Sequence, residues 1–299
     1  MEVPGPTAAI RERLARLYER LPPHERLWLV SYSGGKDSTA LLLAALALAR
    51  ERGFRLAVVY NDTGGDPPEL RALALDVLRW VAGMGHEIFV TRPERTFFDY
   101  LLTRYSPPRW NFRWCCKRLK ELPFRRLVEG LARRHKVLNL VGTRRDEARW
   151  RDWDVRAVNG RLVYAAPLRD ATAGEVWRLV ELLARELDAE WIHRRLAGLY
   201  AGGRVGRTGC WYCPLVVRDS IYEALRPELL RLKLEVLEAW CSGRRERILE
   251  LARERPDLVR VTVGEGEISR DYPCGRRCGA CQVRKVRERL RELMGAVCC

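Results

Sequence analysis

Residues 27–39 read LWLVSYSGGKDST, a compact apolar run followed at once by a polar loop that contains two glycines. The next segment, 39–50, predicts a long helix that ends before Gly53. Glycine permits backbone conformations that other residues avoid, and it lets backbone amides approach an anion. The first turn of the following helix adds unpaired N–H groups and the positive end of the helix dipole. This strand, loop and helix therefore predict a phosphate-binding turn at residues 33–39.

The side chains of this turn suit a nucleotide phosphate and its metal ion. Lys36 supplies a positive charge, and Ser38 and Thr39 supply hydroxyl donors. Asp37 has the oxygen chemistry that Mg²⁺ prefers. The turn is not the G-x4-G-K-[ST] loop of kinases and GTPases. The alternative interpretation is a simple Ser/Gly turn that precedes a core helix.

Apolar strand-like runs alternate with helical segments up to about residue 200. Strands are predicted over 27–32, 55–60, 87–91 and 136–141, and helices over 7–20, 39–50, 68–81, 116–134 and 173–187. This alternation is typical of an α/β fold, a Rossmann-like parallel sheet with helices on both faces. Ligands of such sheets bind beyond the carboxyl ends of the strands, where the segments after Tyr32, Tyr60 and Val141 are expected.

Beyond residue 200 the sequence becomes helical, basic and rich in cysteine, with helices predicted near 220–254 and 283–294. We therefore expect two domains. Residues 1–200 would form a nucleotide-binding domain, and residues 201–299 would form a smaller helical, Cys-rich and basic domain.

The composition is strongly basic, with 55 Lys and Arg against 39 Asp and Glu in 299 residues, a net charge of +16. Such a surface favours phosphate-bearing partners, an adenine nucleotide as well as tRNA or DNA. Only six of the cations are Lys, and a GC-rich genome or a hot habitat would explain this bias equally well. The longest apolar run, 40–49, is far shorter than the roughly 20 residues that cross a bilayer, and no secretory signal is evident. A cytoplasmic protein without a membrane partner is expected.

Ten cysteines fall into clusters, which in a cytosolic chain indicates metal or redox chemistry rather than disulfides. Cys115 and Cys116 are adjacent, and Cys210 and Cys213 form a C-x2-C pair. Four thiolates brought together can hold a [4Fe–4S] cluster or Zn²⁺. A buried cysteine set without a metal is the remaining alternative.

A second set has the spacing C-x3-C-x2-C at Cys274, Cys278 and Cys281. This spacing matches the radical-SAM motif, but no barrel of β/α repeats follows it, so that interpretation is rejected. A second metal site, with Zn²⁺ or another cluster, or a redox-active thiol set is expected instead, and Cys241, Cys298 and Cys299 are the candidates for a fourth thiol. Residues 270–292 contain eight Lys and Arg and three acidic residues. Such a field favours reactive thiolates and suits a phosphate backbone.

Several segments together resemble one protein family. SGGKDST at 33–39 resembles the pyrophosphate loop (PP-loop) of the adenine nucleotide alpha-hydrolase superfamily, whose members cleave ATP to AMP and pyrophosphate. Within it, the chain is similar to the phosphoadenosine phosphosulfate (PAPS) reductase family over roughly 28–215. The supporting segments are DTG at 62–64, CCKRLKELP at 115–123, GTRRDE at 142–147 with Arg149, and PL at 167–168 leading to EVW at 175–177.

The resemblance implies roles for individual residues. Nucleotide-binding residues would be Ser33, Gly34, Gly35, Lys36, Asp37, Ser38, Thr39, Asp62, Thr63, Gly64, Gly142 and Arg149. Catalytic residues would be Lys36, Asp37, Arg144, Arg145 and Cys274, with the arginines facing an anionic substrate. The order Cys115-Cys116 and then Cys210-x-x-Cys213 resembles the [4Fe–4S] pattern of adenylylsulfate reductases and their relatives.

Two activities are compatible with this resemblance. The first is an ATP-dependent sulfurtransferase of the nucleic-acid thiolation type, in which sulfur on the cluster or on a Cys persulfide displaces AMP from an adenylated substrate. The second is reduction of adenylylsulfate or PAPS to sulfite. Reductases usually have a degenerated loop, a Glu-Cys-Gly-Leu-His tail and a tryptophan after Pro-Leu. This chain has a complete loop, only Pro273-Cys274-Gly275 near the tail motif, and Ala171 in place of the tryptophan.

These departures favour the sulfurtransferase, and a non-catalytic nucleotide-binding Fe–S scaffold is a third alternative. The resemblance further implies ATP and Mg²⁺ as ligands, a sulfur- or electron-donor protein as a partner, and a homodimer.

Overall fold

The computed structural model describes residues 6–146, 153–200, 205–206, 208–215, 221–256 and 280–295. The chain divides into two compact units, each built from several segments. The sheet unit consists of Met1–Asn61, Leu70–Thr91 and Phe124–Ala197, and the cysteine unit of Asp62–Glu69, Arg92–Pro123 and Gly198–Cys299. The expected domain boundary at residue 200 stays a prediction. The structure adds that 62–69 and 92–123 group with the C-terminal residues.

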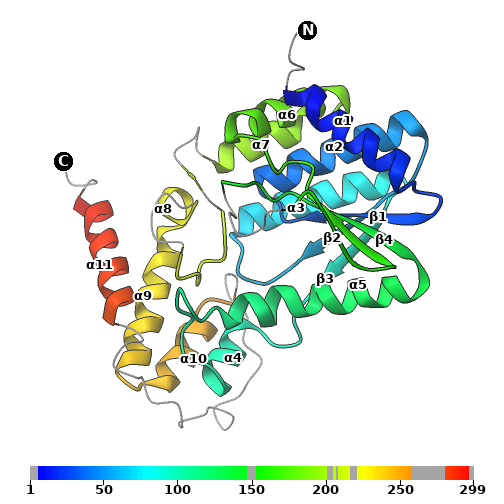
Figure 1. Cartoon of the computed structure of the whole chain (residues 1–299). Coiled ribbons are helices and arrows are strands. Elements are labelled where there is room, and N and C mark those ends of the chain that lie inside the picture. The colour runs from blue at the N-terminus through cyan, green and yellow to red at the C-terminus, as the bar shows by residue number, and fades with distance from the viewer. Residues whose placement is uncertain are drawn as a thin grey trace. The chain divides into compact units, whose positions relative to one another are not determined.

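The sheet unit contains a six-stranded sheet with the strand order β3-β2-β1-β4-β6-β5. Strands β1 to β4 are labelled in Figure 1. The strands are β1 Arg26–Tyr32, β2 Ala57–Asn61, β3 Glu87–Thr91, β4 Lys136–Val141, β5 Val155–Asn159 and β6 Leu162–Ala165. All neighbours are parallel except β5, which runs antiparallel to β6. The predicted α/β fold with a parallel sheet is confirmed. Because β1 and β4 are parallel neighbours, the loops that follow these two strands leave the same edge of the sheet.

The β5–β6 hairpin is absent from the sequence-based prediction. All five residues of β5 are exposed, and β6 has only four residues. An edge strand exposed on both faces has no apolar alternation, so the pattern that reveals a half-buried strand is missing.

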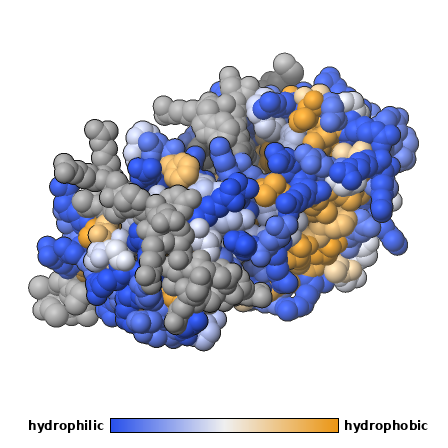
Figure 2. All heavy atoms as spheres, turned by 90° about the horizontal axis from the view of Figure 1, so that it is seen from below, coloured by the Kyte–Doolittle hydropathy of each residue, from blue (hydrophilic) through white to orange (hydrophobic). Residues whose placement is uncertain are grey.

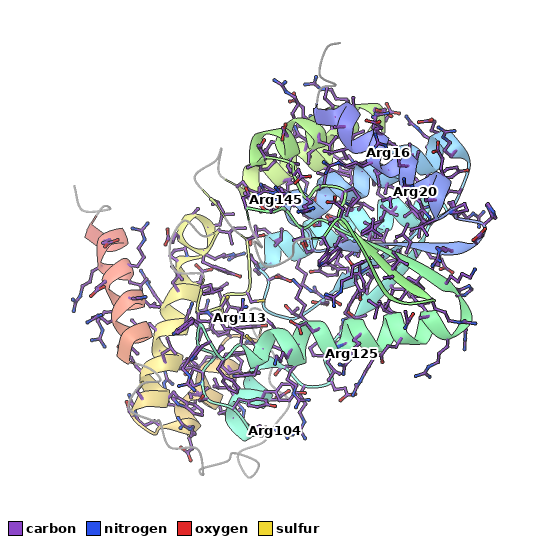
Figure 3. All side chains as sticks on the ribbon, viewed as in Figure 1. Arg16, Arg20, Arg104, Arg113, Arg125 and Arg145 are labelled. Atoms are coloured by element: carbon purple, nitrogen blue, oxygen red, sulfur yellow. The ribbon has the colours of Figure 1, made fainter. Side chains whose placement is uncertain are left out.

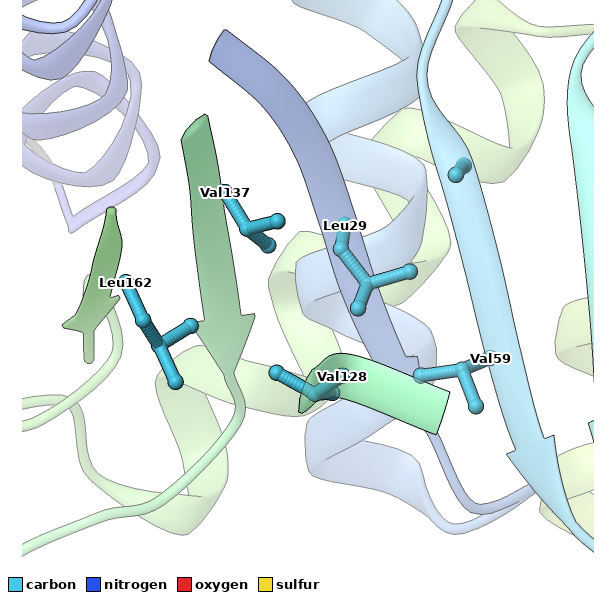
Figure 4. Packing of buried hydrophobic residues seen from close by; sticks show 6 residues of the cluster. Leu29, Val59, Val128, Val137 and Leu162 are labelled. Atoms are coloured by element: carbon cyan, nitrogen blue, oxygen red, sulfur yellow. The ribbon is translucent and has the colours of Figure 1, made fainter. Parts of the chain in front are cut away.

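Helices cover both faces of the sheet, as expected (Figure 1). The helices of this unit are α1 Pro6–Arg20, α2 Lys36–Arg52, α3 Pro68–Gly83, α5 Leu122–Arg134, α6 Ala173–Glu186 and α7 Glu190–Leu199. On one face, Val128 of α5 packs in a cluster with Leu29, Val59, Val137 and Leu162 (Figure 4). On the other face, the ring of Trp28 lies 6.4 Å from the ring of Tyr18 on α1. Adjacent strand residues point to opposite faces, so β1 joins two helical layers.

Helix α2 begins at Lys36 rather than at Thr39, so the polar residues of the loop form its first turn. All residues from Thr39 to Ala49 are buried, which explains why this apolar run belongs to the core. None of the described helices combines the length and apolarity needed to cross a bilayer. Hydrophilic side chains cover most of the face seen in Figure 2, in keeping with the 31% of residues that are charged.

The cysteine unit is helical. Its elements are α4 Phe97–Thr103, the π-helical turn η1 Cys116–Glu121, α8 Ile221–Leu225, α9 Pro227–Cys241, α10 Arg245–Arg253 and α11 Ala280–Gly295. Helix α9 packs against α8, α10 and α11. The helix expected over about 220–254 is therefore three helices, interrupted at Arg226 before Pro227 and at Gly243, whose φ is 74°.

The helix expected over 116–134 is also divided, because it starts with η1 and continues as α5. The N–H of Leu122 bonds to the carbonyl of Lys117, five residues back. Pro123 has no N–H with which to continue an α-helical pattern. The proline therefore marks the change from the wider turn to α5.

Candidate active site

The turn at 33–39 has a backbone that only glycine at position 34 accommodates well. Gly34 has a φ of 80°, in the left-handed region. A Cβ atom at this position would also lie 3.3 Å from the Cβ of Ala74. Gly35 is the N-cap of α2 and provides no side-chain cap, so the first N–H groups of the helix are available to an anion.

The hydroxyl groups of the turn hold its own backbone. The N–H of Ser33 donates to Oγ of Ser38 at 3.1 Å, and Oγ of Ser38 donates to the carbonyl of Gly35 at 3.0 Å. Oγ1 of Thr39 donates to the same carbonyl at 2.9 Å. These bonds fix the shape of the turn before any ligand binds.

Asp37 lies between two buried cations. Its Oδ2 atom accepts a hydrogen bond from Nζ of Lys36 at 2.8 Å, and its Oδ1 atom accepts one from Nε of Arg144. The side chains of Lys36 and Arg144 are only 8% and 4% exposed. Nη1 of Arg144 also lies 2.6 Å from Oδ2 of Asp146. The structure thus brings together three of the predicted catalytic residues, each with its charge balanced.

Gly142, at the end of β4, lies directly against the start of α2. A Cβ atom here would be 3.0 Å from the carbonyl oxygen of Asp37 and 3.1 Å from the nitrogen of Ser38. Because Gly142 has no side chain, the end of β4 can lie close to the turn at 33–39. This close packing places Arg144 next to Asp37.

Replacing Gly142 with alanine is expected to weaken ATP binding roughly tenfold, because the new methyl group must displace the backbone of Asp37 and Ser38. Calorimetric titration with ATP measures the effect. Gly160→Ala is the matched control, since a Cβ atom at that position meets nothing within 4 Å. Equal affinities of the two variants would show that the approach at Gly142 does not shape the site.

Two other arginines with predicted site roles, Arg145 and Arg149, do not join the Asp37 group in the described structure. Nη2 of Arg145 lies 2.9 Å from Oδ1 of Asp170, and its side chain is 59% exposed. It is not joined to the Asp37 group by any contact described. Arg149 lies outside the described residues. Asp146 lies in the GTRRDE segment but was given no role from the sequence, and Asp170 is absent from the sequence-based prediction.

The segment 62–65 contacts the second cysteine pair within the cysteine unit. Oγ1 of Thr63 lies 3.7 Å from Sγ of Cys210 and accepts a hydrogen bond from the N–H of Gly65 at 3.2 Å. Asp62 is buried and pairs with Nε of Arg92 at 3.1 Å. The role of Asp62, Thr63 and Gly64 in holding adenosine stays a prediction.

Gly65 is a further important residue that sequence reasoning missed. Its carbonyl accepts hydrogen bonds from the N–H of Trp211 at 2.9 Å and from the hydroxyl of Tyr222 at 3.1 Å. A Cβ atom here would come within 2.5 Å of the ring of Tyr212. The contact joins residues more than a hundred positions apart in sequence, so no local pattern reveals it.

The four cysteines of the first set interact electrostatically within the cysteine unit. A hydrogen bond with Cys116 raises the pKa of the Cys115 thiol, and burial and the nearby Cys210 and Cys213 add to this. The same bond from Cys115 lowers the pKa of Cys116, helped by Arg113 and Lys120. Burial raises the pKa of Cys210 to about 12.

These thiols fit a four-thiolate metal group in their chemistry. Cys116 opens η1, and the N–H of Cys213 donates to the carbonyl of Cys210 at 2.9 Å, which closes the turn between the pair. In the part of the chain that the structure describes, however, no three Cys, His, Asp or Glu side chains are grouped closely enough to hold a metal ion. The four thiols are therefore of the right chemical type, but the structure does not place them in positions to coordinate one metal ion.

Lys233 is a buried cation beside this set. Its Nζ atom donates to the carbonyl of Cys213 at 2.5 Å. Burial lowers the pKa of Lys233 to about 8, while Cys213 and Cys115 act in the opposite direction. A single lysine in the leucine-rich stretch of α9 was the available sequence signal.

Of the second cysteine set, the structure describes only the backbone position of Cys281. Cys274 and Cys278 lie outside the described residues, and Cys281 falls on the first turn of α11. A second metal or redox site therefore stays a prediction.

No curated protein matches the chain. A solved PAPS reductase from Candida auris is 14% identical with a TM-score of 0.47, over 68% of this chain and 89% of that chain. The U34-tRNA thiolase NcsA from Methanococcus maripaludis, solved with its [4Fe–4S] cluster, is 15% identical with a TM-score of 0.40, over 92% of this chain and 87% of that chain. A family model of the phosphoadenosine phosphosulfate reductase domain matches residues 28–215, more than half of the chain, and the protein therefore belongs to that family.

Proposed function

We propose that this protein is an ATP pyrophosphatase that adenylates an oxygen of a nucleic acid and exchanges that oxygen for sulfur. The observation that carries the proposal is the contact of Lys36, Asp37 and Arg144 at the first turn of α2. The SGGKDST turn keeps the charged groups that a leaving pyrophosphate and its metal ion require. A family member that never cleaves ATP has no need of them.

The residues of the turn would act in the first half of the reaction. The N–H groups at the start of α2 and the Lys36 ammonium would bind the β- and γ-phosphates, and Arg144 would neutralise charge that develops on the leaving pyrophosphate. Once phosphate takes up these cations, Asp37 would be able to turn toward the Mg²⁺ that accompanies ATP. The substrate oxygen attacks the α-phosphorus, and the bond from that phosphorus to its bridging oxygen breaks, leaving AMP on the substrate.

The second half requires a sulfur donor, here hydrosulfide delivered by a donor protein. Its lone pair forms the new bond to the substrate atom, and AMP leaves with the electrons of the bond that breaks. Cys115, Cys116, Cys210 and Cys213 would hold a [4Fe–4S] cluster, or Zn²⁺ as the alternative for four thiolates. When bound, the cluster supplies a position at which sulfide is carried. Lys233 would hold the Cys210–Cys213 turn through the Cys213 carbonyl.

Reduction of adenylylsulfate or PAPS to sulfite is a second candidate, and the family match favours it. That reaction needs a cysteine nucleophile. The nearest sequence match to the reductase tail is at Cys274, which the structure does not describe. The complete turn at 33–39 keeps the sulfurtransferase ahead of this alternative.

The deciding experiment compares two reactions of the anaerobically purified protein. Supplied with ATP, Mg²⁺, hydrosulfide and either bulk tRNA or single-stranded DNA, it is expected to release AMP and pyrophosphate in equal amounts. Sulfite formed from adenylylsulfate or PAPS with a thiol reductant, without turnover of ATP, would replace the proposal with the second candidate.

A further inference from the structure

The segment 100–120 of the cysteine unit is strongly basic. It contains six cations and no acidic residue, the cations being Arg104, Arg109, Arg113, Lys117, Arg118 and Lys120. Among the described residues, none of these six cations forms an ion pair with a carboxylate. Several exposed arginines of the sheet unit, by contrast, do pair with acidic residues. Figure 3 shows Arg104 and Arg113 on this segment. An unneutralised run of this kind attracts a polyanion.

Trp110 stands at the tip of a tight hairpin within this segment. The N–H of Arg109 donates to the carbonyl of Phe112 at 3.1 Å, and the N–H of Phe112 donates back at 3.0 Å. Trp110 is 75% exposed, and the next most exposed large hydrophobic side chain in the described structure, Val158, is 54% exposed. A tryptophan this exposed loses the burial that normally stabilises it.

The hairpin is anchored to the aromatic core of the unit. The ring of Phe112 lies 6.3 Å from that of Tyr105, which stacks on Trp114 at 4.8 Å. Nε1 of Trp114 donates to the carbonyl of Ser106 at 2.8 Å, and its ring stacks on Phe97 at 5.6 Å. The exposed indole is thus presented from a rigid support, so little conformational entropy is lost when a ligand covers it.

The same segment contains Cys115 and Cys116, two members of the first cysteine set. Trp114 directly precedes Cys115, and Arg113 and Lys120 are close enough to lower the pKa of Cys116. A ligand held by these cations would be brought next to the thiols that we propose to carry sulfur chemistry.

We propose that segment 100–120 binds single-stranded nucleic acid, with an unpaired base stacked on Trp110 and the phosphates held by the surrounding cations. An exposed indole with Arg109 and Arg113 before and after it in sequence matches the alternation of flat bases and phosphates along a strand. An acidic protein would satisfy the cations but give no reason for the exposed ring. The inference deepens the proposed function, because it specifies an acceptor with unpaired bases and the surface that binds it.

Fluorescence anisotropy with a labelled oligo-dT strand and an abasic strand of equal length tests the inference. Trp110→Ala is expected to weaken oligo-dT binding roughly tenfold and to leave abasic binding unchanged, because stacking needs a base. Trp110→Phe keeps a ring and should lose less than about threefold. Arg113→Gln is expected to weaken both strands alike, and to flatten the salt dependence. Arg20→Gln, an exposed arginine on α1 of the sheet unit, is the control and should change neither (Figure 3).

Two results would overturn the inference. One is a Trp110→Ala variant that binds oligo-dT as the unsubstituted protein does. The other concerns heparin, a polyanion that has no bases. If heparin competes as well as oligo-dT does, and Trp110→Ala does not change this competition, the surface binds an acidic partner instead. These titrations contain no ATP. Base-dependent binding without pyrophosphate release would therefore refute only the proposed function, and pyrophosphate release without base-dependent binding would refute only this inference.

Discussion

An Asp37→Asn variant is expected to bind ATP but to release pyrophosphate about 10²–10³-fold more slowly than the unsubstituted protein. The amide keeps the size of the carboxylate and removes its charge. Lys36 and Arg144, both nearly buried, then lose the counter-charge that they share in the ligand-free site. With less counter-charge beside them, these two cations should bind the nucleotide phosphates at least as tightly as before, while Arg144 keeps its ion pair with Asp146. The Mg²⁺ that accompanies the reacting phosphates would lose the carboxylate that we propose as its ligand, so the chemical step should slow.

Asp146→Asn is the matched control, because Asp146 also pairs with Arg144 but its side chain is 60% exposed and lies outside the turn. This variant should release pyrophosphate within about fivefold of the unsubstituted protein, since exposed ion pairs contribute little. Both variants are compared by steady-state pyrophosphate release, by ATP titration and by thermal unfolding. A folded Asp37→Asn protein that turns over ATP normally would remove Asp37 from the reaction.

The parts of the fold that follow from local pattern were predictable from the sequence. The apolar run at 27–32 and the turn at 33–39 carry their own signals, since burial on both faces gives a continuous apolar strand and a phosphate turn needs glycine. The pairing of Asp37 with Arg144 has no such signal. It depends on β1 and β4 being neighbours in the sheet, although more than a hundred residues separate them. Strand order is a long-range property that periodicity does not encode.

The cysteine unit depends even more on contacts between residues far apart in sequence, which local patterns do not reveal. Residues 62–69 and 92–123 join the C-terminal residues through contacts such as that of Gly65 with Trp211 and Tyr222. Cysteine spacing predicted which thiols would act together, and the electrostatic coupling of Cys115 with Cys210 and Cys213 is compatible with that grouping. Lys233 was missed because a lysine within a helix is usually solvated, and only the packing of α9 buries this one.

A Cys210→Ala variant is expected to lose the metal of the first cysteine set. The unsubstituted protein, purified without oxygen, should contain about four iron and four sulfide per chain and have a broad visible absorbance. Removing one of four thiolate ligands leaves an iron without a protein donor, and Thr63, whose hydroxyl is 3.7 Å from Sγ of Cys210, is a poor substitute. Iron and sulfide should therefore fall to a small fraction of their original content. Both are measured chemically, independently of any activity.

Cys241→Ala provides the control for this experiment, because Cys241 is an exposed cysteine at the end of α9 and is not one of the four thiols of the first set. It should retain full iron and colour, which would attribute the loss in Cys210→Ala to the position and not to the removal of any thiol. A colourless unsubstituted protein with one equivalent of zinc, lost in Cys210→Ala and kept in Cys241→Ala, would preserve the four-thiolate site but refute the cluster. Iron content that both variants retain would show that Cys210 is not a ligand. The predicted grouping of the two cysteine pairs would then have to be abandoned, since the Cys210–Cys213 turn would contribute at most one donor.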